Sequence, residues 1–82
     1  MQETTITDEK MLDIYKNIGK NVKEIRKAKG ISQLSLAMAI GHKAVGTVSM
    51  SEICLNKKHF NIEHLYKIAE VLEVDVCEFF KA

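Results

Sequence analysis

Apolar side chains recur every three or four positions in the first third of the chain, which is the spacing of one stripe of an α-helix. The stripe consists of Met11, Ile14, Tyr15, Ile18, Val22 and Ile25. Thr7 is placed to cap the first turn, and Gly30 suits a left-handed stop. The pattern predicts a helix over about residues 8–29. Gly19 lies inside it at a cost of up to about 1 kcal/mol relative to Ala, which favours a break there.

Two shorter helices are expected next. Ser32 is a cap and Gly41 a terminator, so a short second helix lies between them. After a turn at Gly41, His42 and Lys43, a third helix is expected over about residues 45–55, although Gly46 weakens its start. The apolar side chains that it is expected to bury are Val48 and either Ile53 or Leu55.

The last third of the chain predicts two more helices after a polar loop at residues 56–60. Asn61 caps a fourth helix, whose apolar positions are Ile62, Leu65, Ile68, Ala69 and Leu72. Asp75 followed by Glu78 is close to a capping box and predicts a short fifth helix. No repeat, linker or run of β-branched residues appears. The expected fold class is therefore all-α, with one core shared by five helices.

Composition fits one compact domain. The chain has 82 residues, of which 46% are hydrophobic, with no Pro and only two Cys. No apolar run approaches the ~18 residues of a membrane span, and the N-terminus does not resemble a secretory signal. We therefore expect a cytoplasmic protein without a membrane partner. Cys54 and Cys77 form no paired motif, so reduced, partly buried thiols are expected.

The charge is unevenly distributed, although the formal net charge is only +1. Residues 1–17 carry −2, residues 18–30 carry +4, residues 31–61 carry +2 and residues 62–82 carry −3. A basic centre suits a protein with one face for a polyanion, but a solvated helix surface gives similar bands.

The middle of the chain resembles the Xre and Cro type helix-turn-helix family over about residues 18–80. The residues that carry the resemblance are Ile25-Arg26-Lys27-Ala28-Lys29-Gly30-Ile31-Ser32-Gln33, Leu36-Ala37, Ile40-Gly41, Val48-Ser49, Glu52 and Leu65-Tyr66-Lys67-Ile68-Ala69-Glu70-Val71-Leu72. The resemblance implies a compact five-helix, lambda-repressor-like domain over residues 18–82, preceded by a helical extension over residues 1–17. It also implies a non-enzymatic regulator of transcription that binds double-stranded DNA.

In this family the second helix crosses the DNA backbone and the third enters the major groove. Ala37 must be small so that the third helix can cross the second closely, and Gly41 supplies the turn. Gln33 matches the family's phosphate-anchoring glutamine. Carried over by the same resemblance, the other candidate DNA-binding residues are Lys43, Val45, Gly46, Thr47, Ser49 and Met50, with Asn56, Lys57 and Lys58 in the loop that follows the backbone.

The chain departs from the family pattern by one extra residue between Gly41 and Val48 and two between Glu52 and Leu65. The register of the contact residues is therefore open. The expected reading surface also lacks Arg, Gln and Asn, which make bidentate contacts with G or A. Sequence preference should then be modest, and rest on thymine methyl contacts from Val45 or Met50, on the Ser49 hydroxyl, or on DNA shape.

Other interpretations remain open beside this one. Gln33, Lys43, Lys57 and Lys58 are also compatible with an ordinary solvated surface, and Val45 and Met50 with partial burial or a protein contact. The main alternative is a protein-interaction module that uses the apolar third helix and does not depend on DNA. A membrane-surface helix is less favoured, because residues 1–17 are net acidic.

Residues of other chemistry point to no catalytic or metal site. The possible ligands Cys54, Cys77, His42, His59 and His64 match none of the usual zinc spacings. No acid pair, nucleophile with a base or phosphate loop stands out, so we expect no enzyme, cofactor or small-molecule ligand. Cys54 is a redox-sensing thiol only if its pKa is depressed.

A homodimer is expected, with two recognition helices in successive major grooves about 34 Å apart. Phe79 and Phe80 on the fifth helix are the candidate contact, because two adjacent aromatics hardly both face one small core. The alternative is that Phe79 belongs to the core and Phe80 lies over the first helix.

Overall fold

A computed structural model describes residues 2–82. The elements are α1 (Asp8–Ala28), α2 (Gln33–Ala39), α3 (Gly46–Ile53), the 3₁₀ turn η1 (Leu55–Lys57), α4 (Ile62–Leu72) and the 3₁₀ segment η2 (Val76–Phe80). The described part of the chain contains no strand, which confirms the all-α fold. The predicted fifth helix is a 3₁₀ segment, so the described residues form four α-helices and not five.

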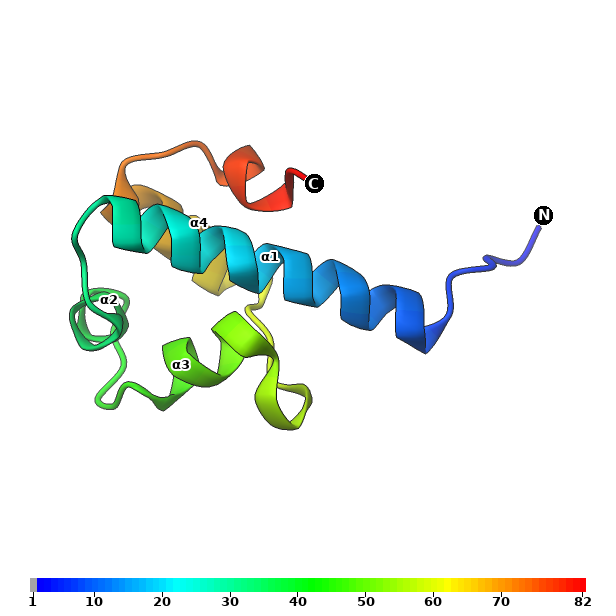
Figure 1. The fold of residues 1–82 in the computed structure, drawn as a ribbon, viewed down its shortest axis with the longest axis horizontal. Helices are drawn as coiled ribbons and strands as arrows, with labels where there is room; N and C mark the ends of the chain where they lie inside the picture. Colours follow the sequence, from blue (N-terminus) through cyan, green and yellow to red (C-terminus); the bar gives the residue numbers. More distant parts are fainter. Residues whose placement is uncertain (1) are drawn as a thin grey trace.

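The long helix α1 crosses the whole molecule (Figure 1). α3 packs against one side of it and η2 against another. The first turns of α1 project beyond the other elements, and the longest dimension of the molecule is 43 Å. Thr7 caps the helix as predicted, because its hydroxyl accepts a hydrogen bond from the Lys10 N–H at 3.1 Å.

The expected break in α1 at Gly19 is wrong, because the helix continues through it. Gly19 is buried where α1 meets the last turn of α3. A Cβ atom at this position would lie 2.5 Å from the Glu52 carbonyl oxygen and 2.6 Å from that of Ser51. Glycine is therefore needed for the close approach of two helices, which outweighs its poor helix propensity.

The core lies between α1 and the remaining elements. Its buried side chains are Ile18, Val22, Leu36, Ala37, Ile40, Val48, Phe60, Leu65, Ile68, Ala69, Leu72 and Phe79. Ala37 is fully buried beside Leu36, as the close crossing of α2 and α3 requires. Ile53 and Leu55 are 56% and 47% exposed, so the prediction that α3 buries one of them is wrong. Ser51 and Glu52 occupy the inner face of the last turn in their place.

The C-terminal segment packs through one aromatic residue only. Phe79 is fully buried, whereas Phe80 is 51% exposed, so of the two candidate dimer contacts only Phe80 remains exposed, and Phe79 belongs to the core as the alternative had it. Asp75 caps η2 by accepting from the Cys77 N–H. Glu78 does not complete a capping box with Asp75, and instead forms an ion pair with Lys81 at 2.6 Å.

Candidate nucleic-acid interface

The segment from α2 to α3 presents one side of α3 to solvent. Gly41 makes the turn with φ of +95°, and Ile40 beside it is buried. Val48, Ser51 and Glu52 fix the inner face of α3. The helical periodicity then places Gly46, Met50 and Ile53 on the opposite, outer face, with Ser49 at its edge.

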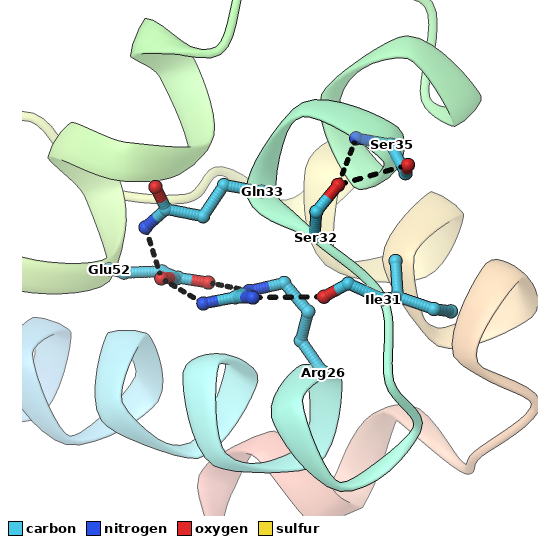
Figure 2. A network of polar contacts seen from close by, with 6 residues as sticks. All are labelled: Arg26, Ile31, Ser32, Gln33, Ser35 and Glu52. Atoms are coloured by element: carbon cyan, nitrogen blue, oxygen red, sulfur yellow. Dashed lines mark hydrogen bonds and ion pairs between the residues drawn. The ribbon is translucent and has the colours of Figure 1, made fainter.

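A buried ion pair joins α1 to α3 behind this outer face (Figure 2). Arg26 Nε lies 2.7 Å from Glu52 Oε2, and its Nη2 lies 3.1 Å from Glu52 Oε1. Arg26 Nη1 also donates to the Ile31 carbonyl oxygen at 2.9 Å, where the chain enters α2. The bidentate pair therefore fixes the end of α1, the start of α2 and the last turn of α3 relative to one another.

Gln33, the first residue of α2, belongs to the same network. Its Nε2 donates to Glu52 Oε1 at 2.8 Å, and the side chain is half-buried (Figure 2). Sequence reasoning placed Gln33 at a phosphate and missed this contact. The amide nitrogen carries two hydrogens, so one remains for a second acceptor while Glu52 fixes the orientation of the amide.

The other α3 candidates lie around its N-terminus with varied exposure. Lys43 and Val45 are exposed, and Gly46, Thr47, Ser49 and Met50 are partly buried. The Thr47 hydroxyl lies 3.4 Å from His42 Nδ1, and the Ser49 hydroxyl donates to the Gly46 carbonyl oxygen at 3.3 Å. α3 begins one residue later and ends two residues earlier than predicted, and Val45 is its N-cap.

The basic loop after α3 has a defined backbone. Asn56, Lys57 and Lys58 are all exposed. Cys54, Asn56 and Lys57 have φ values of 54°, 54° and 62°, in the left-handed region that costs non-glycine residues about 1 kcal/mol or more. The Lys58 N–H donates to the Leu55 carbonyl oxygen at 3.0 Å and closes the turn. The two lysines therefore extend from a tight turn next to α3.

Three histidines surround a hollow of about 330 Å³ between α3, this loop and α4. Its lining is His42, Thr47, Ser51, Lys57, Lys58, His59 and His64. The His42 and His64 rings meet edge to face with centroids 5.3 Å apart. His64 Nδ1 accepts the Asn61 N–H at 3.2 Å, while Asn61 Oδ1 accepts the His64 N–H at 2.7 Å, which completes a capping box on α4.

The free energy of unfolding is expected to depend on pH through His64 of this capping box. Burial lowers the pKa of His64, and nearby His42 lowers it further. The unfolded chain therefore binds this proton more readily than the folded one, so the stabilisation is complete above the unfolded pKa of ~6.5 and is lost as pH falls through the folded value. Chemical denaturation between pH 7.5 and pH 5 should show a falling free energy of unfolding.

The matched variant is His64→Gln, which can keep the capping box without a titrating ring. Its free energy of unfolding should fall less over the same pH range. An equal fall in both proteins would assign the effect to other groups.

The surroundings of the two cysteines bear on the hypothesis of a redox-sensing thiol. Cys54 and Cys77 are both free thiols, as expected, but Cys54 is buried and Cys77 exposed. Burial raises the pKa of Cys54 and nearby Lys16 lowers it by less, which contradicts the depressed pKa that a redox-sensing thiol needs.

Among residues 2–82, no cluster of three His, Cys, Asp or Glu side chains is arranged to hold a metal ion. No helix in this part of the chain is both long and apolar enough to cross a membrane.

Comparison with known families agrees with this geometry. A sequence model of the family described as helix-turn-helix matches residues 22–79, which include α2, α3, α4 and the last third of α1. The match confirms the resemblance to the Xre and Cro type and supports a DNA-binding regulator in general terms. A search of curated protein sequences found no match.

Proposed function

Because the chain belongs to the helix-turn-helix family, we propose that it regulates transcription as a homodimer whose α3 helices enter successive major grooves of double-stranded DNA. The observation that carries the proposal is the outer face of α3, which is left open while Val48, Ser51 and Glu52 hold its inner face. A major groove is wide enough to admit such a helix. The boundary between an extension at residues 1–17 and a DNA-binding domain at residues 18–82 remains part of this proposal.

The residues around α3 support phosphate contacts on both of its sides. Gln33 keeps one amide hydrogen free next to the start of α2. Lys43 precedes α3, while Lys57 and Lys58 follow it in the tight turn with Asn56. Contacts of this kind position the protein on DNA and give affinity without sequence information.

Base reading would depend on small and apolar side chains. Val45, Gly46, Ser49 and Met50 are the proposed reading residues, and the exposed Ile53 extends the same face. Thr47 is turned toward His42 at the edge of the helix, which suits a phosphate contact better than a base contact. Thymine methyl groups and DNA shape are therefore the proposed sources of a modest sequence preference.

A salt series of binding to random duplex DNA tests the proposal. We expect log affinity to fall with log salt at a slope of about −3 to −7, the range for a few phosphate contacts. Lys57→Ala/Lys58→Ala should flatten the slope by about 2. Gln33→Ala should weaken binding with a smaller change in slope, because Gln33 is uncharged. No binding at low salt would contradict the proposed function.

One observation favours a second candidate, a protein-interaction module on the same scaffold. Leu34 and Met38 on α2 are 51% and 63% exposed, and Ile53 at the end of α3 is 56% exposed. Exposed apolar side chains on adjacent helices are typical of protein-binding surfaces. Indifference to DNA in the salt series, together with a stable fold, would favour this function.

A further inference from the structure

The first turns of α1 line a groove together with residues at and around the η1 turn. Beyond the contact of Gly19 with α3, the helix continues past the last residues of α3 without a further helix against it (Figure 1). The groove has a volume of about 390 Å³. The apolar part of its lining is Met11, Leu12, Tyr15 and Cys54, and Asp8, Glu9, Lys57 and His59 complete it.

Two aromatic rings of the lining contact each other, and a leucine of the lining is exposed. The Tyr15 ring stacks on the His59 ring with centroids 3.6 Å apart, which fixes α1 to the loop before α4. Leu12, one turn further out, is 38% exposed. An apolar groove continuing along an exposed helix is suited to receive another helix.

The charges along this helix form a self-complementary pattern. Asp8, Leu12 and Lys16 follow one another at intervals of four residues and so lie along one side of α1. All three are exposed. Among the ion pairs formed within residues 2–82, none involves Asp8 or Lys16. The acidic and basic ends of the stripe are therefore equidistant from Leu12 and available to a partner.

We propose that a second copy of the chain docks in this groove with its α1 antiparallel, about a two-fold axis beside Leu12. The axis brings Leu12 against Leu12 of the second copy, and each Asp8 level with Lys16 of the other. Such an isologous contact uses each charge pair twice. This contact would be the dimer interface of the proposed DNA-binding regulator, and the inference rests on that proposed function.

Two surfaces are candidates for the dimer contact, one on the C-terminal segment and one on α1. The sequence favoured Phe79 and Phe80 as the dimer contact, but only Phe80 is exposed. The stripe of Asp8, Leu12 and Lys16 favours α1, because its charges are complementary to those of a second, antiparallel copy. The two surfaces are far apart in sequence but near each other in space, because the Lys81 carbonyl oxygen next to Phe80 accepts a hydrogen bond from Asn17 Nδ2, one residue from Lys16, at 2.8 Å.

Sedimentation of the full chain, in a concentration series reaching high micromolar, tests the proposal. We expect the wild type to dimerise, and Leu12→Glu to remain monomeric while melting at a similar temperature, because Leu12 is exposed. Tyr66→Glu on α4 is the matched control, since Tyr66 is 63% exposed and lies outside the groove, and should dimerise like the wild type. A monomeric wild type, or dimerisation lost in Phe80→Glu but kept in Leu12→Glu, would overturn the proposal.

Charge reversal tests the antiparallel pairing itself. Asp8→Lys and Lys16→Asp should each weaken dimerisation about tenfold, because each removes two ion pairs and creates repulsion. The double variant restores opposite charges and should regain most of the loss. A double variant weaker than both single variants would exclude this arrangement.

The proposal and the proposed function fail in different ways. Leu12→Glu changes no residue of α2, α3 or the basic loop, so it should still bind random DNA at low salt with a similar slope per chain. Wild-type DNA binding without a dimer would refute the docking surface and the homodimer, and leave DNA binding through α3 standing. A dimer that does not bind DNA would refute the function and leave the docking surface standing.

Discussion

Replacing Gly19 by Ala is expected to destabilise the protein by about 3 kcal/mol, the cost of overpacking a close contact. In an isolated helix the same change stabilises by up to about 1 kcal/mol. The sign reverses because the new Cβ would lie 2.5 Å from the Glu52 carbonyl oxygen, and the other close atoms also belong to the α3 backbone. Only a shift of α3 away from α1 relieves this. Urea denaturation of both proteins measures the difference.

Gly46→Ala is the control for this prediction. A Cβ on Gly46 meets no atom within 4 Å, and the residue begins α3. This variant should be as stable as the wild type or more stable, by up to about 1 kcal/mol. If Gly19→Ala behaved in the same way, the close approach of α1 and α3 would be refuted.

The helix caps could be predicted from the sequence, whereas the role of Gly19 could not. Thr7, Ser32 and Asn61 are caps in the structure as predicted, because a cap depends on residues two or three positions away. The function of Gly19 depends on Ser51 and Glu52 of α3, more than thirty positions later in the chain. Local propensity alone therefore predicted a break where the structure has a tight contact.

The end of α3 was unpredictable for a related reason. Helices commonly end at a glycine in the left-handed conformation, but here Cys54 adopts it with φ of 54°. With no glycine to mark the end, the predicted helix extended to Leu55 and buried the wrong residues. Ser51 and Glu52 face inward because Glu52 has a partner, Arg26, that no local pattern could supply.

In the candidate site, too, the sequence predicted which segments lie around α3 but not which of their side chains touch. The resemblance placed Gln33, Lys43 and the basic loop around α3, and the structure has them on the segments that flank this helix. Their roles at DNA stay predictions. The contact between Gln33 and Glu52 was not predicted, although Arg26, Gln33 and Glu52 all belong to the matched motif, because the motif contains no information on which of its residues touch.

Arg26→Met is expected to destabilise the domain by about 3–5 kcal/mol, because it leaves the Glu52 carboxylate buried without its cation. The side chains of Arg26 and Glu52 are 8% and 0% exposed, so water cannot replace the lost partner. A domain of this size has a total stability of about 4–12 kcal/mol, so this variant should approach unfolding at room temperature. Thermal and urea denaturation measure the loss.

The double variant Arg26→Met/Glu52→Met separates the charge from the packing. It removes both charges and keeps apolar volume, so it should be less destabilised than Arg26→Met alone, in which one buried charge remains. A double variant with the summed loss of both single variants would show that the two residues act independently. If it folds, its Gln33 has lost the acceptor that orients the amide. Its affinity for random duplex DNA should then fall to that of Gln33→Ala, whereas unchanged affinity would show that Glu52 stabilises the fold without positioning Gln33 for DNA.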